Sequence, residues 1–122
     1  MNLVVLLGKV LTEPTLESAP QGRRVCRFRL STSNGKNRQP DYHFIVLWGR
    51  DNTDIHPENV ARLLRRGSTV QITGRIHESR WRSKETQEPR SRTEIIINNI
   101  QFINLAPREQ TTEESNGNAL SE

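Results

Sequence analysis

The order in which two hydrophobic periodicities follow one another limits the fold of this chain more than any other feature. Three segments have the apolar pattern of β-strands, at 2–12, 23–33 and 41–49. A segment at 56–66 then has helical spacing, and further strand patterns follow at 69–81 and 93–105. Strands repeat every two residues and helices every 3.6, so the pattern changes to helical only once. This order predicts an all-β domain with one short helix between the third and fourth strands.

The alternation within the strands predicts which side chains face outward. In the third strand, one face carries Tyr42, Phe44, Val46 and Trp48, and the other carries His43, Ile45 and Leu47. In the second strand, one face carries Cys26, Phe28 and Leu30, and the other carries Val25, Arg27, Arg29 and Ser31. Residues 3–7 are apolar without interruption, which predicts cover on both faces of the first strand. Phe28 and Phe102 are predicted core residues.

Five strands with one helix after the third is the order of the OB barrel, a five-stranded Greek-key barrel. Pro57 suits the first position of the helix, and Gly67 suits the position just past its end. Gly74 predicts a bend or bulge in the fourth strand, and residues 13–22 and 82–92 are predicted loops. An SH3-like or other small barrel is the alternative, although such barrels rarely place a helix at this point.

The charge of the chain is unevenly distributed. Residues 1–107 carry 17 basic and 10 acidic side chains, and 15 of the 18 basic residues of the whole chain are arginines. A basic body favours a polyanionic partner, and arginine favours planar contacts with phosphates and bases. Residues 108–122 carry four acidic side chains, one basic side chain and a single large aliphatic residue, Leu120. They are predicted to form a disordered acidic tail.

Several classes of protein do not fit this sequence. No apolar run approaches the ~20 residues of a membrane span, and the N-terminus does not resemble a signal peptide. The single cysteine, Cys26, is typical of a reducing cytoplasm. The three histidines lack metal-ligand spacing, and no phosphate-binding glycine loop or catalytic triad order is present. We expect a cytoplasmic protein that has no membrane association, no metal or other cofactor, and no enzymatic activity.

Segments in this order resemble the bacterial-type single-stranded DNA-binding proteins. The resemblance is carried by MNLVVLLGK at 1–9, VCRFRLSTS at 25–33, YHFIVLWG at 42–49 and ENVARLLRRGS at 58–68, with 70–81 and 93–102 as the last strands. It implies an OB domain over 1–107 that binds single-stranded DNA without sequence preference in replication, recombination and repair. It also implies a homo-oligomer, commonly a tetramer in this family, that works at the nucleoid.

Three features depart from the family pattern. The link at 50–57 is longer than usual, and the loop between the second and third strands is short and lacks an aromatic residue often found there. The family's tail commonly ends in aspartates and a Pro-Phe tip, whereas this chain ends in NALSE at 118–122. Without that tip the tail has no hydrophobic anchor, which argues against recruitment of replication or repair proteins through it.

Three aromatic residues are candidates for stacking on bases, namely Tyr42, Trp48 and Trp81. By resemblance, all three occupy positions at which the family stacks bases. Stacking is worth ~1–3 kcal/mol per base in this mode of binding, of which the family is itself an example. The alternative for Trp48 is core packing, and the alternative for Tyr42 is an ordinary place at a sheet edge. Arg80 and Arg82 flank Trp81 and favour its exposure.

Ten basic residues are candidates for contacts with phosphates. They lie on the outward faces of the second and fourth strands and in the loops that border the OB binding face. They are Arg23, Arg24, Arg27, Arg29, Arg75, Arg80, Arg82, Lys84, Arg90 and Arg92. The alternative for any one of them is a solvated surface charge. Arg62, Arg65 and Arg66 fit better with solvation of the helix and with its dipole.

Two other functions are compatible with the same sequence. One is a primosome-type OB protein that mainly binds partner proteins, which the absent tail tip and the few aromatic residues favour. The other is an OB-fold module that binds RNA, with which the excess of arginine is compatible. Competition between DNA and RNA oligomers would separate a DNA-binding from an RNA-binding protein.

Overall fold

The computed structural model describes residues 1–49 and 55–107. Most of the long link, at 50–54, and the predicted tail at 108–122 lie outside the described residues. The elements in chain order are β1 (Val4–Val10), β2 (Thr15–Ser18), a 3₁₀ turn (Pro20–Gly22), β3 (Arg24–Thr32), β4 (Asp41–Trp48), α1 (Pro57–Leu63), β5 (Thr69–Arg82) and β6 (Pro89–Asn104). Among the described residues, no helix is long and apolar enough to cross a membrane.

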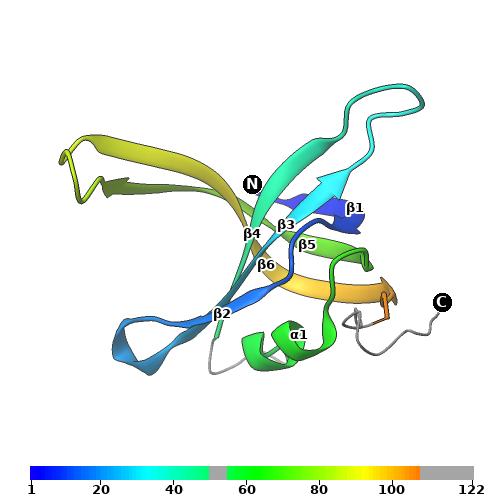
Figure 1. The fold of residues 1–122 in the computed structure, drawn as a ribbon, viewed down its shortest axis with the longest axis horizontal. Helices are drawn as coiled ribbons and strands as arrows, with labels where there is room; N and C mark the ends of the chain where they lie inside the picture. The colour runs from blue at the N-terminus through cyan, green and yellow to red at the C-terminus, as the bar shows by residue number, and fades with distance from the viewer. Residues whose placement is uncertain (50–54, 108–122) are drawn as a thin grey trace, which may run out of the picture.

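The strands form one sheet that closes on itself. Their order is β1-β5-β6-β4-β3-β2, and an additional pairing of β1 with β3 closes a ring of five strands (Figure 1). The pairings are antiparallel except for that of β4 with β6, which is parallel. The helix α1 follows β4 and lies at one end of the barrel (Figure 1). The predicted OB fold is confirmed, with its helix after the third long strand.

Alternation along the strands builds the core of the barrel. The buried cluster takes Cys26, Phe28 and Leu30 from β3 and Ile45 and Leu47 from β4. The strands β5 and β6 add isoleucines and a valine, and Val60 and Leu64 of the helical segment close the end of the barrel. Burial also raises the pKa of the Cys26 thiol to about 12, because an apolar environment disfavours the thiolate. Cys26 is therefore a small core residue in its neutral form.

Gly74 marks the point at which β5 separates from β1. The register between the two strands shifts between Thr73 and Gly74, as the predicted bulge requires. A Cβ atom at Gly74 would collide with the carbonyl oxygen of Ile96, so the position needs glycine. Beyond it, residues 78–82 and 89–93 pair with each other alone in the described chain. They form an arm that projects from the barrel (Figure 1), and we call these residues the β5–β6 arm.

Two predicted loops are partly strand. Residues 15–18 form β2, which pairs with β3 from Thr15 opposite Arg27 to Ser18 opposite Arg24. Only Leu16 of this strand packs against the core, so four residues carry too little periodicity to be seen in the sequence. The predicted loop at 82–92 is also too long, because β6 begins at Pro89. Both faces of the arm meet solvent, and the apolar alternation that marks a half-buried strand is therefore absent.

Two further predictions about packing are wrong. The helix ends at Leu63, and Gly67 lies beyond its cap, with a φ of 92° in the turn into β5. Phe102 is not a core residue, since 37% of it is exposed. The predicted cover on both faces of the first strand is present on one face in the single chain: Val4 and Leu6 pack against the core, whereas Leu3, Val5 and Leu7 are 58–60% exposed.

Candidate nucleic-acid interface

The outward face of β4 is the centre of the candidate site. Ile45 and Leu47 point into the barrel, so the alternate residues Tyr42, Phe44, Val46 and Trp48 point outward. The strand register shows which residues of the neighbouring strands lie on the same face. Arg29 of β3 lies opposite Phe44, and Phe44 lies opposite Glu94 of β6. Aromatic rings from the centre of the sheet therefore stand between charged side chains from both neighbouring strands.

Five of these side chains form one continuous row. The guanidinium carbon of Arg29 lies 5.6 Å from the ring centre of Tyr42 and 5.0 Å from that of Phe44. The guanidinium carbon of Arg92 lies 4.5 Å from the ring centre of Phe44 and 5.6 Å from that of Trp81. We call Tyr42, Arg29, Phe44, Arg92 and Trp81 the arginine–aromatic row. It runs from the start of β4 to the β5–β6 arm and alternates ring with cation, at distances typical of cation–π contacts.

The three predicted stacking residues differ in exposure. Tyr42 is 51% exposed and Trp81 is 45% exposed, so both offer ring surface to a ligand. Trp48 is half-buried but is outside the core cluster. The guanidinium of Arg23 lies 4.5 Å from the ring centre of Trp48, which makes a second arginine–aromatic contact beside the row.

Glu94 lies under the row and is 5% exposed. Its Oε2 atom is 3.0 Å from Nη2 of Arg92 and 3.5 Å from Nη1 of Arg27. Arg27 also pairs with the exposed Glu17, at 3.4 Å. The charges of Arg27 and Arg92 are thus partly compensated, whereas the structure shows no carboxylate partner for Arg23 or Arg29 within the described ranges.

Arg23 and Arg29 also have unused hydrogen-bonding capacity. Nη2 of Arg23 and Nε of Arg29 are buried atoms without a hydrogen-bond partner among the described residues. A buried donor without a partner is costly. An acceptor brought by a ligand, such as a phosphate or base oxygen, would remove that cost, so both side chains suit a ligand rich in such acceptors.

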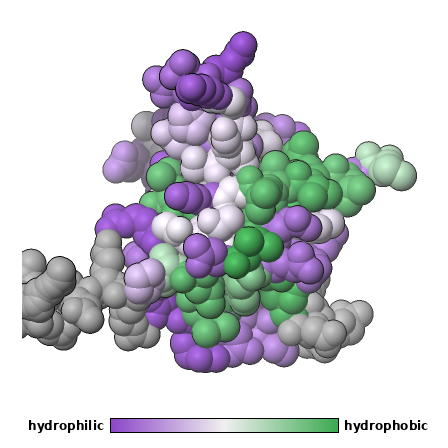
Figure 2. Space-filling model, turned by 90° about the vertical axis from the view of Figure 1, so that its right-hand side faces the viewer, coloured by the Kyte–Doolittle hydropathy of each residue, from purple (hydrophilic) through white to green (hydrophobic). Residues whose placement is uncertain are grey.

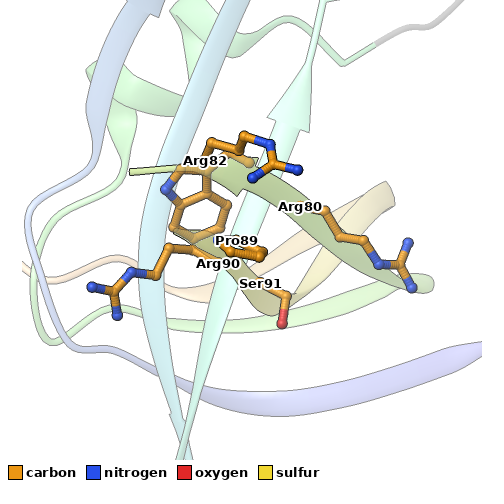
Figure 3. Close-up of a pocket in the computed structure, with 6 residues that line it drawn as sticks. Arg80, Arg82, Pro89, Arg90 and Ser91 are labelled. Carbon is orange, nitrogen blue, oxygen red and sulfur yellow. The ribbon is translucent and has the colours of Figure 1, made fainter. Parts of the chain in front are cut away.

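The register of the β5–β6 arm separates its basic residues onto two faces. Trp81 lies opposite Arg90, and Arg92 lies opposite Ser79, which places these residues on the face shared with Phe44. Arg80 and Arg82 alternate to the other face of β5. Figure 3 shows Arg80 and Arg82 projecting to one side of Pro89 and Arg90 to the other. They surround an open hollow of about 500 Å³ that Trp81 also lines.

The remaining predicted basic residues are placed less uniformly. Arg75 lies opposite Ile96 on the outward face, and Lys84 is exposed in the loop at the tip of the arm. Arg90 pairs with Glu88 at 3.7 Å. Arg24 alternates away from the outward face and lines a hollow near Pro57 and Glu58. The structure therefore brings most of the predicted set to the face and the arm but separates Arg24, Arg80 and Arg82 from the row.

A smaller hollow of about 210 Å³ adjoins the row on the barrel. Its walls include Phe44, Val46, Arg27, Arg29 and Arg92. The bend between β1 and β2 supplies the hydroxyl groups of its rim, from Thr12 and Thr15. Glu13 also lines the hollow, so three arginines and one carboxylate surround an apolar floor. Such a floor can receive the flat, partly apolar surface of a base while phosphates stay near the arginines.

A comparison with protein families identifies the chain. A model of the single-strand binding protein family matches residues 1–103. The chain belongs to this family. The match covers the whole barrel and the arm, and therefore every residue of the arginine–aromatic row. The family predicted from the sequence is confirmed.

Individual relatives agree with this assignment. The chain is 32% identical over 110 residues to a single-stranded DNA-binding protein of Oceanobacillus iheyensis, covering 84% of this chain and 63% of that protein. It is 30% identical over 108 residues to single-stranded DNA-binding protein A of Bacillus subtilis, covering 84% and 59%. A single-stranded DNA-binding protein of Treponema pallidum is 28% identical over 109 residues, with 84% and 58% covered. The chain thus spans roughly three-fifths of the length of these relatives.

Two residues of the candidate interface were not predicted from the sequence. Phe44 shares a face with Tyr42 and Trp48, and that alternation was a signal that could have marked it as a third aromatic residue of the strand. Glu94 gave no comparable signal, because an acidic residue in a predicted strand usually faces solvent. Its role depends on the register that brings β3, β4 and β6 together.

Proposed function

We propose that this chain binds single-stranded DNA without sequence preference, on the outward face of β3 and β4 and along the β5–β6 arm. The arginine–aromatic row is the observation that carries the proposal, with Tyr42, Phe44 and Trp81 separated by two guanidinium groups. Rings can stack on any base, because every base has a flat π face, and arginines can contact the phosphates between bases. Family membership supports the same ligand.

This mode of binding explains a preference for single strands. In a duplex the base faces are stacked on one another, so the rings of the row would find only phosphates and groove edges. A single strand exposes base faces and phosphates together. Stacking on exposed bases therefore discriminates single strands from duplex, and the basic residues add affinity that depends on salt.

Titration of oligo-dT into the protein, followed by tryptophan fluorescence, tests the proposal. We expect quenching that saturates, because Trp48 and Trp81 are the only tryptophans of the chain and both are proposed to contact bases. Duplex DNA of the same length and salt condition is the control, and it should bind much more weakly. Equal affinity for duplex and single strand would contradict the proposal. Tighter binding of oligo-U than of oligo-dT would favour the RNA-binding alternative instead.

Phe44 should contribute to binding although it was not a candidate in the sequence. We expect Phe44→Ala to weaken oligo-dT binding by ~1–3 kcal/mol, the usual effect of removing one ring from such a site. Part of this loss comes from Arg29 and Arg92, which lose the ring against which both now lie. Fluorescence titration measures the change in affinity.

Phe102→Ala is the matched control for this variant. It removes the same side chain from a partly exposed position at the far end of β6, away from the row. Its affinity should equal that of the wild type, and its unfolding temperature should change about as little as that of Phe44→Ala. Equal affinities for the two variants would show that Phe44 does not contribute.

We also propose that the chain assembles into a homo-oligomer through β1. Leu3, which directly precedes β1, and Val5 and Leu7 within it form an exposed hydrophobic stripe. The strand pairs with β3 only at Lys9 and Val10, which leaves its earlier residues with a free edge. Figure 2 shows hydrophobic surface gathered on this side of the barrel. A free edge with an apolar face favours addition of a second strand. Sedimentation equilibrium should give a mass above that of the monomer. A monomer mass at all concentrations would contradict the proposed oligomer.

The wider role follows from family membership. We propose that the protein protects single strands during replication, recombination and repair, in the cytoplasm at the nucleoid, and that it acts by binding alone.

Residues 1–107 would form the binding domain, and residues 108–122 would be a separate tail that binding does not require. A chain that ends at Pro107 should then bind oligo-dT with unchanged or slightly higher affinity, and a large loss of affinity would contradict the division.

A further inference from the structure

Glu94 is a negative charge placed within a face that is proposed to bind a polyanion. Its side chain is almost fully buried, and burial of a carboxylate is costly unless cations and hydrogen bonds compensate it. Simple electrostatics would make this residue a disadvantage for DNA binding. Its position therefore needs a reason other than the net charge of the face.

The contacts of Glu94 connect arginines from two different strands. Nε and Nη2 of Arg92 donate to Oε2, at 3.3 and 3.0 Å, and Nη1 of Arg27 lies 3.5 Å from the same oxygen. Arg92 precedes Glu94 by two residues on β6, whereas Arg27 reaches it from β3, across the intervening β4. One carboxylate oxygen thus fixes two guanidinium groups that would otherwise have many rotamers.

Arg92 is the member of the row that connects the barrel with the arm. It lies against Phe44 of the barrel and against Trp81 of the arm. Residues 78–82 and 89–93 pair with each other alone in the described chain, so no strand pairing joins Trp81 or Arg92 directly to β4. The guanidinium of Arg92, held by Glu94, contacts both rings and so connects Trp81 with Phe44.

We propose that Glu94 is a positioning residue of the DNA-binding face, whose carboxylate holds Arg92 between Phe44 and Trp81, with Arg27 beside it, before DNA arrives. This inference rests on the proposed function. Ordering of long side chains opposes association, so a protein that has already ordered them binds more tightly. Glu94 lowers the charge of the face by one and in return removes the freedom of two arginines.

Glu94→Gln tests the inference, with Glu17→Gln as the matched control. Both variants remove one negative charge beside Arg27, but Glu17 is exposed and does not contact Arg92. If only net charge mattered, both variants would bind oligo-dT more tightly. We expect Glu17→Gln to bind with equal or slightly higher affinity. We expect Glu94→Gln to bind about three- to tenfold more weakly, because the arginines must now be ordered by the ligand.

A second measurement reports on the free protein. In a Trp48→Phe background, Trp81 is the only tryptophan, and its emission reports the contact with Arg92. We expect Glu94→Gln to change the emission maximum or intensity of Trp81 without DNA, and Glu17→Gln to leave both unchanged. Thermal unfolding of each variant establishes that the titrations are made on folded protein. This readout would not respond if Glu94 only stabilised the barrel.

The possible outcomes separate this inference from the proposed function. If the wild type does not bind oligo-dT, the proposed function fails, whatever the variants do. If the wild type binds and Glu94→Gln binds as tightly as Glu17→Gln, the positioning role is wrong and the proposed function stands. An unchanged Trp81 emission in Glu94→Gln would also overturn the positioning role, even if affinity fell.

Discussion

Replacement of Trp81 by alanine is expected to weaken binding of oligo-dT by ~1–3 kcal/mol, which corresponds to a factor of about 5 to 150. Trp81 is 45% exposed and lies on the β5–β6 arm, outside the core cluster. Its contact with Arg92 and its place at the edge of an open hollow leave ring surface free for a base. Because the ring lies on the arm and not in the core cluster, the free energy of unfolding should change by less than about 1 kcal/mol.

Ile76→Ala provides the matched control for this variant. Ile76 is also a large, half-exposed hydrophobic residue of β5, but it lies opposite Ile95, on the other face of the strand from Trp81. Its replacement should leave affinity unchanged in the same fluorescence titration. The interpretation of Trp81 as a platform would be wrong if Trp81→Ala unfolded the domain while the folded fraction retained wild-type affinity.

Strong local periodicity explains why the fold could be predicted. The alternation at 41–49 predicted that Ile45 and Leu47 share one face and Tyr42 and Trp48 the other, and in the structure the first pair belongs to the core and the second does not. Pro57 marked the start of the helix for a local reason as well, since its fixed φ and missing N–H suit the first helical position. Each of these features depends on residues near one another in the chain.

Features that depend on pairing between distant strands could not be predicted in the same way. The row requires Arg29, Phe44 and Arg92 to meet across three strands, and strand register is not encoded in the period of any one of them. The exposure of Phe102 is a similar case, because an aromatic residue near the end of a strand is buried only if another element covers that end of the barrel.

Arginine chemistry was predictable only in part. Composition indicated a polyanionic ligand, but the sequence does not show which arginines carry uncompensated charge. In the structure Arg27, Arg90 and Arg92 each lie near a carboxylate. Arg80 and Arg82 have no such partner in the described part of the chain, although Nη1 of Arg82 donates to the carbonyl oxygen of Gln87. The two arginines of the arm that have no carboxylate partner in the described chain therefore lie on the face opposite Trp81.

This distribution of arginines leads to a prediction about how the affinity for oligo-dT depends on salt. Replacement of Arg80, Arg82 and Arg92 together by alanine should flatten the plot of log affinity for oligo-dT against log salt concentration. Each phosphate neutralised on a single strand contributes about −0.7 to that slope, so loss of three contacts would reduce its steepness by up to ~2. Arg92 should contribute less than the other two, because Glu94 already compensates part of its charge.

A control with the same change of net charge separates direct contact from general attraction. Arg62, Arg65 and Arg66 lie on α1 or in the turn that follows it, away from the arginine–aromatic row. Alanine at these three positions should lower affinity at low salt only slightly. The slope should stay close to that of the wild type, because it measures the counterions released at phosphates that the protein contacts directly. If both triple variants flattened the slope equally, the phosphates would be held by the overall charge of the barrel. If only the variant in the arm did so, the strand would pass along the arm, and single replacements of Arg80 and Arg82 would show whether it uses the face opposite Trp81.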